Sequence, residues 1–134
     1  MRAIADSGFI VAHWSKTPAR RQWAQTWWTT AELPLLTSAA NLQEAGWLLE
    51  NHEIILRMVK DGDLFVALDV QQEAVPLHAL VAKYQPRADL ADAAIIRLSE
   101  LYPRAKVLTV DREDFQIYCR FGHKPIPCNF GPEL

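Results

Sequence analysis

Acidic side chains stand at five positions of this chain where folding could bring them together. Asp6 follows a short apolar stretch, and Asp111 follows the run KVLTV. Carboxylates that lie close together repel one another, so at least one must hold its proton unless a cation removes the conflict. Oxygen ligands of this kind, without a cluster of histidine or cysteine, suit magnesium or manganese rather than zinc. The other three acids are Glu44, Asp89 and Asp92.

Each of these acids also has an ordinary structural explanation. Asp89 precedes the segment LADA and is either a helix N-cap or a ligand. Asp92 would lie in the first turn of that helix, where the helix dipole favours an acid by about 0.3–1 kcal/mol. Asp6 and Asp111 could each form a turn after a strand, and Glu44 could lie on a solvated helix face. We favour a common site because the acids occur in the order strand, helix, helix, strand.

Strand-like and helix-like segments alternate along the chain. The stretch 64–68 is apolar throughout, which is typical of a strand covered on both faces. Gly62 suits a left-handed C-cap, and Ser7 and Gly8 turn the chain after the first strand. Strands are expected over residues 2–5, 33–37, 64–68 and 106–110, with an edge strand over 123–127. Helices are expected over residues 18–32, 38–51, 52–62, 73–84 and 113–121, and a further helix opens at Asp89.

This alternation predicts a single α/β domain over residues 1–134. The expected architecture is a three-layer sandwich with a central parallel sheet of about four to five strands, flanked by helices. In such a sheet, ligands gather beyond the C-terminal ends of the strands. If the first and fourth strands are neighbours, Asp6 and Asp111 converge at one rim of the sheet, together with the acids on the helices.

Composition limits the classes of protein to consider. A chain of 134 residues with a formal net charge of −2 can bury a core, but its overall field does not attract nucleic acid. Cys119 and Cys128 have no zinc-ligand spacing and are expected to be reduced thiols. No apolar run is long enough to span a bilayer and no signal peptide is recognisable, so we expect a cytoplasmic protein without a membrane partner.

The five acids lie in four segments, which occur along the chain in the order IADSGFIVA, LTSAANLQEAGWLLE, DLADAAIIRLSE and KVLTVDREDF. With these segments the chain resembles a PIN-domain ribonuclease, and more narrowly a VapC-type toxin of a type II toxin–antitoxin system. The resemblance implies that Ser7 and Thr109 supply hydroxyl groups near a metal and that Asp89 is a companion ligand. It implies catalytic, metal-binding roles for Asp6, Glu44, Asp92 and Asp111.

The resemblance also implies a reaction and partners. The reaction is hydrolysis of RNA phosphodiester bonds with one or two Mg²⁺ or Mn²⁺ ions, and Arg112 is the expected phosphate contact. A cognate antitoxin and a homodimer are the expected protein partners. Trp23, Trp27 and Trp28 lie on a helix that either packs into the core or forms part of an antitoxin groove.

Three other functions stay open at this point. The chain could be a housekeeping PIN nuclease in RNA processing, or a catalytically inactive PIN-like domain that binds RNA or protein. A phosphate-handling enzyme that uses Asp6 as a nucleophile ranks last, because such enzymes carry a DxD pattern after the first strand and here Ser7 and Gly8 follow Asp6.

Overall fold

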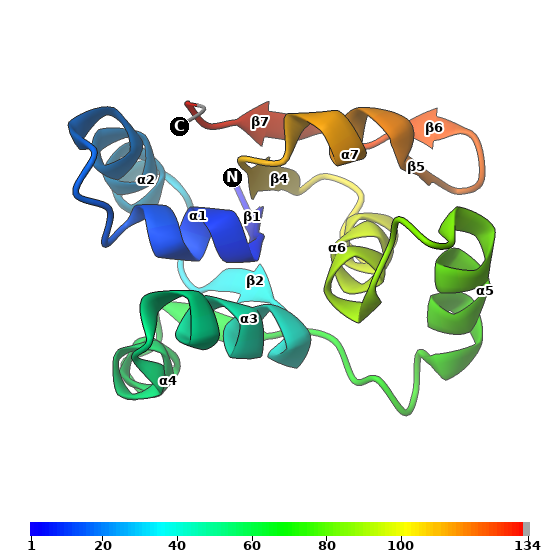
Figure 1. The fold of residues 1–134 in the computed structure, drawn as a ribbon, viewed down its shortest axis with the longest axis horizontal. Coiled ribbons are helices and arrows are strands. Elements are labelled where there is room, and N and C mark those ends of the chain that lie inside the picture. Colours follow the sequence, from blue (N-terminus) through cyan, green and yellow to red (C-terminus); the bar gives the residue numbers. More distant parts are fainter. Residues whose placement is uncertain (133–134) are drawn as a thin grey trace.

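A five-stranded parallel sheet forms the centre of the molecule (Figure 1). The computed structural model describes residues 1–132. The strand order β3-β2-β1-β4-β7 places the first strand in the middle, and every neighbouring pair is parallel. The predicted α/β sandwich with a parallel sheet is therefore confirmed. Its strands are β1 (Ala3–Ala5), β2 (Leu35–Thr37), β3 (Leu64–Val66), β4 (Lys106–Thr109) and β7 (Cys128–Phe130).

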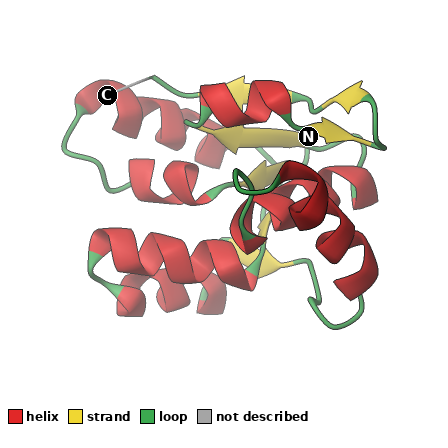
Figure 2. Cartoon of the chain, turned by 45° about the vertical axis from the view of Figure 1, so that its right-hand side comes forward, coloured by secondary structure: helices red, strands yellow, loops and turns green. Residues whose placement is uncertain are grey.

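Helices cover both faces of this sheet (Figure 2). Successive side chains of a strand point to opposite faces, so Ile4 packs on one side of β1 while Ala3 and Ala5 pack on the other. The first side meets buried residues of α5 and α6, and the second meets buried residues of the first four helices. The helices are α1 (Ser7–Ala12), α2 (Pro18–Thr30), α3 (Ala39–Leu49), α4 (His52–Lys60), α5 (Ala74–Tyr84), α6 (Leu90–Leu101) and α7 (Arg112–Ile117).

The start of α1 explains why glycine follows Ser7. After β1 the chain enters α1 directly at Ser7, where the sequence indicated only a turn. A Cβ atom at Gly8 would lie 2.5 Å from Cγ2 of Val110, so only glycine lets α1 approach the end of β4 this closely. Gly62 has a φ of +84°, which confirms its predicted left-handed position after α4.

The third strand is an edge strand, and the expectation that it is covered on both faces is wrong. It ends at Val66 and has only β2 as a neighbour. Phe65 is 53% exposed, so the apolar run 64–68 reflects a hydrophobic sheet edge as well as a buried strand.

The C-terminal segment also differs from the prediction. The helix expected over 113–121 ends at Ile117, and β5 (Cys119–Arg120) then pairs antiparallel with β6 (Lys124–Pro125) through a turn at Phe121 and Gly122. The predicted edge strand over 123–127 is therefore part of this hairpin. The strand beside β4 is β7 instead, which pairs parallel with β4 and forms the second edge of the sheet.

Within residues 1–132, none of the helices combines the length and the apolar character that crossing a bilayer requires.

Candidate functional site

Asp6 lies where the sheet changes the direction of its winding. The chain passes from β1 to β2 and β3 on one side, then returns to place β4 on the other side of β1. Such a switch point leaves a crevice beyond the C-terminal ends of the two strands. Asp6 directly follows β1, and its N–H donates to the carbonyl of Leu108 at 3.1 Å. The sheet itself therefore fixes the position of this residue.

Three donors hold the carboxylate of Asp6, which is only 7% exposed. Oδ1 accepts hydrogen bonds from the backbone N–H of Ser7 at 2.8 Å and from Nδ2 of Asn41 at 3.1 Å. Oδ2 accepts a hydrogen bond from Oγ1 of Thr109 at 2.6 Å. Both oxygens are thus oriented by residues from β4 and α3 before any ligand arrives.

Burial raises the pKa of Asp6 to about 6. The hydrogen bonds from Thr109 and Ser7 act in the opposite direction, because they stabilise the charged form. The negative charges of Glu44 and Asp111 raise the pKa further. The first acid is therefore a carboxyl group that loses its proton only near neutral pH.

Asp92 occupies the first turn of α6 and has a similar environment. Oδ2 accepts a hydrogen bond from the hydroxyl of Tyr118 at 2.8 Å. Burial raises the pKa of Asp92 to about 7 against the effect of that hydrogen bond, and the charges of Asp89, Asp6 and Asp111 add to the rise. Asp6 and Asp92, which are far apart in the sequence, therefore lie within electrostatic reach of each other.

Asp111 follows β4 and begins α7. Its Oδ1 accepts a hydrogen bond from the N–H of Asp114 at 3.0 Å, which makes Asp111 the N-cap of that helix. Its own N–H donates to Oγ1 of Thr109 at 3.0 Å. Burial raises the pKa of Asp111, and the charges of Asp114 and Glu113 also contribute. Thr109 thus links the first and last acids, since the same hydroxyl donates to Asp6.

The remaining two acids have different surroundings. Glu44 is half-buried on α3, and its charge reaches Asp6. Asp89 is exposed, and its Oδ1 caps α6 by accepting a hydrogen bond from the N–H of Asp92 at 2.9 Å. The structure therefore shows Asp89 as a helix N-cap, one of the two roles expected for it, while its charge raises the pKa of Asp92.

The chemistry of these groups fits a hard divalent cation. All the candidate ligand atoms are oxygens, and the pKa values of Asp6 and Asp92 are raised by burial and by the charges of other acids of the set, which a doubly positive ion would offset. In residues 1–132, however, no three side chains of His, Cys, Asp or Glu are already close enough together to share an ion. The carboxylates lie near one another without forming a finished ligand cage.

Two residues at this site were not recognised in the sequence. Asn41 is fully buried and donates from Nδ2 to Asp6 and to Oγ of Ser7, at 3.1 and 3.2 Å. Its place one helical turn before Glu44 was the available signal, since residues three apart share a helix face. Tyr118 gave no comparable signal, because only the packing of the chain after α7 brings it to Asp92.

The tryptophans of α2 have separate roles. Nε1 of Trp23 and Nε1 of Trp27 both donate to Oδ1 of Asn129, at 2.8 and 3.2 Å, so these two rings attach α2 to β7. Arg112, the expected phosphate contact, is exposed at the start of α7 with its guanidinium 4.8 Å from the centre of the Phe130 ring. Trp28, the third of these tryptophans, lines a cavity.

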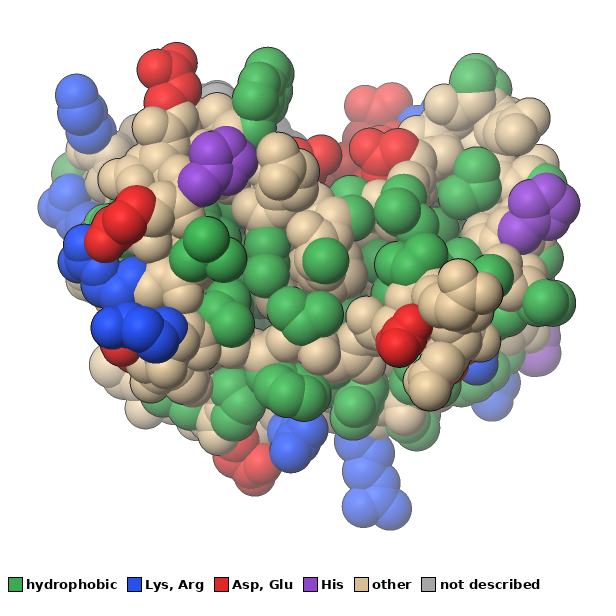
Figure 3. Space-filling model, turned by 90° about the horizontal axis from the view of Figure 1, so that it is seen from below, with side chains coloured by type: hydrophobic (Ala, Val, Ile, Leu, Met, Phe, Trp, Pro, Cys, Tyr) green, Lys and Arg blue, Asp and Glu red, His purple; other side chains and the backbone are tan. Residues whose placement is uncertain are grey.

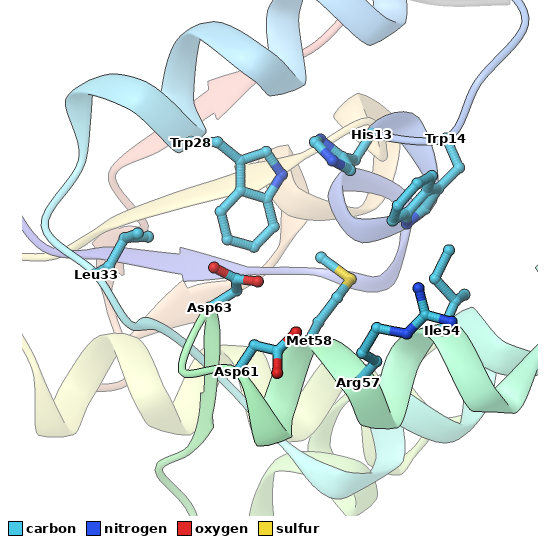
Figure 4. A pocket seen from close by; sticks show the side chains of 9 residues that line it. All are labelled: His13, Trp14, Trp28, Leu33, Ile54, Arg57, Met58, Asp61 and Asp63. Carbon is cyan, nitrogen blue, oxygen red and sulfur yellow. The ribbon is translucent and has the colours of Figure 1, made fainter.

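That cavity has a volume of about 300 Å³ and is shown in Figure 4. The rings of His13, Trp14 and Trp28 form one wall, and Met58 lies opposite them. Asp63, also in the lining, precedes β3, so the cavity lies at the N-terminal ends of the strands. The acids follow the C-terminal ends of β1 and β4, and the two sites are therefore at opposite ends of the sheet.

A third surface feature is the face formed by α3, α4 and the segment that leads to α5 (Figure 3). Hydrophobic side chains spread across the middle of this face, and acidic side chains flank an indentation at its upper edge in this view. Of the large apolar side chains on these two helices, Trp47 on α3 is 70% exposed and Leu56 on α4 is 63% exposed.

Comparison of the sequence with models of known protein families gave no match, and comparison with curated proteins gave none either.

Proposed function

We propose that this chain is a metal-dependent endoribonuclease of the PIN-like kind, and that it acts as the toxin of a toxin–antitoxin pair. The observation that carries the proposal is the gathering of Asp6, Asp92 and Asp111 at the switch point of the sheet, where burial and nearby negative charges raise their pKa values. Acids with a merely structural role on an exposed surface repel one another little, and they need no hydrogen bonds from buried side chains to hold them. Here Asn41 and Thr109 both donate hydrogen bonds to the carboxylate of Asp6.

In this proposal Asp6, Glu44, Asp92 and Asp111 hold one or two ions of Mg²⁺ or Mn²⁺. When bound, such an ion supplies positive charge to the scissile phosphate and lowers the pKa of a water molecule. A bound ion would offset the repulsion between the ionised carboxylates. Asp92 and Asp6 give up their protons at that moment, so the protein's own groups couple cation binding to proton release.

The other residues orient these acids and the substrate. Thr109 and Asn41 keep both oxygens of Asp6 in place, so the first ligand is preorganised. Arg112 meets a phosphate of the RNA backbone next to Asp111, and its packing on Phe130 limits the motion of the guanidinium.

The substitution Asp6→Asn tests the proposal. Cleavage of RNA in the presence of Mg²⁺ should fall by at least about 100-fold, because loss of mere outer-shell partners already costs about 10–100-fold. Thermal unfolding and circular dichroism should show that the fold is intact. The matched control is Asp69→Asn, which changes an exposed acid in the turn before α5 and should keep full activity. Wild-type cleavage by the Asp6→Asn variant would remove the proposal.

The partners in this proposal follow from the resemblance to the toxin family. With Trp23 and Trp27 attached to Asn129, an antitoxin segment would meet α2 chiefly at Trp28 and the cavity beside it. A housekeeping nuclease would use the same acids without such a partner. A neighbouring reading frame for a short DNA-binding protein, and its copurification with this chain, would separate the two.

A further inference from the structure

Tyr118 is buried next to the acid site without being one of the acids. Its side chain is 1% exposed and packs against the rings of Tyr84 and Phe115, with centroid distances of 5.0 and 5.2 Å. Both contacts are edge-on, at interplanar angles of 66° and 88°, so the ring is held on two sides. The hydroxyl at the end of this fixed ring has little freedom to choose its partner.

The partner of that hydroxyl is a carboxylate. The Tyr118 hydroxyl donates to Oδ2 of Asp92 at 2.8 Å, across 26 positions of the sequence. A buried phenol needs an acceptor, and backbone carbonyls are the commonest ones. Here the acceptor is Asp92 on α6, whose pKa is raised by the charges of Asp6 and Asp111. The hydrogen bond engages one carboxylate oxygen of Asp92 and leaves Oδ1 for another interaction.

The backbone around Asp92 does not fix its side chain in the same way. Asp89 caps the N–H of Asp92, which sets the start of α6 but leaves the Asp92 side-chain torsions to other contacts. Tyr118 supplies such a contact from the residue that follows α7, outside the helix of Asp92. Residues that hydrogen-bond to metal ligands, without touching the metal themselves, typically set the orientation of those ligands.

We infer that Tyr118 is a positioning residue: its hydroxyl holds Oδ2 of Asp92 so that Oδ1 is presented to the cation. This inference rests on the proposed function, because it concerns the cation of the same site. Tyr118 does not touch the ion or the RNA in this role, and it acts only through Asp92.

The chain provides a matched control in Tyr84. Its ring belongs to the same aromatic cluster, and its hydroxyl also has one hydrogen bond, accepted from the N–H of Cys119 at 2.9 Å. That partner is backbone, however, and not an acid. Tyr84→Phe and Tyr118→Phe therefore each remove one partly or fully buried hydroxyl from the cluster, but only Tyr118→Phe frees a carboxylate of the acid site.

The test measures binding of Mn²⁺ alone, by electron paramagnetic resonance of the free ion, on full-length protein. Tyr118→Phe should bind Mn²⁺ about 10–100-fold more weakly than the wild type. Tyr84→Phe should stay within about 3-fold of the wild type, although its thermal midpoint in chelator should also fall, because a buried N–H loses its acceptor. Equal Mn²⁺ affinity of Tyr118→Phe and the wild type would overturn the inference.

A double-mutant cycle separates positioning from general damage to the fold. If Tyr118 acts through Asp92, Tyr118→Phe should weaken Mn²⁺ binding strongly in the wild type and little in an Asp92→Asn background. Equal losses in both backgrounds would show a merely structural role. If the wild type and Tyr84→Phe bind Mn²⁺ but cleave no RNA, the nuclease proposal fails while the role of Tyr118 stands. If the wild type binds no Mn²⁺, both fail together.

Discussion

At the scale of single residues, the hydroxyl of Thr109 connects the two ends of the site. It donates to Asp6 and accepts from the N–H of Asp111, so one side chain at the end of β4 serves both acids. Its hydrogen bond lowers the pKa of Asp6, but burial raises that pKa more strongly, to about 6. The result is a carboxyl group that titrates close to neutral pH and whose ionised form is disfavoured by folding.

This balance predicts how the pH changes the stability of the metal-free protein. Asp6 ionises near pH 3.8 in an unfolded chain and near pH 6 in the folded one, so between these values the folded state binds the proton more tightly. The free energy of unfolding should therefore fall as the pH rises from about 4 to about 6, by about 3 kcal/mol for this group. Asp92, with a pKa of about 7, extends the fall to neutral pH.

Urea unfolding of the wild type and of Asp6→Asn, in chelator, checks this prediction. His13 has a lowered pKa and destabilises the folded protein toward acid pH, so the difference between the two proteins is the useful quantity. Asp6→Asn should gain on the wild type as the pH rises from 4 to 6 and keep that gain above pH 6. A difference independent of pH would contradict the pKa assigned to Asp6. Added Mg²⁺ should stabilise the wild type more at pH 7.5 than at pH 5, because protons compete for the same oxygens.

At the scale of elements, the strand β7 is joined to α2 by one amide. Oδ1 of Asn129 accepts the indole N–H groups of both Trp23 and Trp27, and a Cβ atom at Gly131 would lie 2.5 Å from the ring of Trp23. The last strand of the sheet is thus attached to the core-facing side of α2, a helix more than 100 positions earlier in the chain. The rings of Trp23 and Trp27 pack against the part of the core that contains Phe9 and Ile10.

We expect Asn129→Ala to destabilise the protein by about 2–4 kcal/mol, because two indole N–H groups lose their acceptor and each unsatisfied donor costs about 1–3 kcal/mol. Chemical denaturation measures this loss directly. The control Gln25→Ala changes an exposed position of α2 and should have little effect. If Asn129→Ala were as stable as the control, the attachment of α2 to β7 through Asn129 would be contradicted.

The elements that the sequence predicted correctly are those with a clear local pattern. Periodic apolar residues and capping residues predicted α2, α3, α4, α5 and α6, and four of the sheet strands follow from short apolar runs. The C-terminal hairpin and β7 were missed because each is only two or three residues long and is fixed by contacts with distant parts of the chain. The acids could be proposed from strand ends, whereas Tyr118 reaches Asp92 only through tertiary packing.

At the scale of the whole molecule, one edge of the sheet and the neighbouring helices present an apolar surface. Phe65 on the edge strand β3 is 53% exposed, and Trp47 and Leu56 add exposed rings and methyl groups on α3 and α4. Exposed apolar area of this kind marks interaction surfaces, and edge strands pair readily with other strands. We propose that the homodimer implied by the family resemblance forms through this surface.

Analytical ultracentrifugation over a range of concentrations tests this assignment. The wild type should sediment as a dimer, and Phe65→Glu and Trp47→Glu should each shift it to the monomer without loss of secondary structure. Ile117→Glu is the control, because Ile117 is 45% exposed on α7, away from that face. A wild type that stays monomeric, or variants that stay dimeric, would contradict the assignment.

The central position of β1 has a consequence for the nascent chain during synthesis. The strand β1 is made before the other four strands of its sheet and becomes the middle one, and the Thr109 hydroxyl that donates to Asp6 is made 103 positions later. A nascent chain, or one cut short by early termination, therefore carries Asp6 without Thr109 or Asp111. Whatever chemistry these acids perform is withheld from the translating ribosome and its RNA until β4 has been made and has docked beside β1.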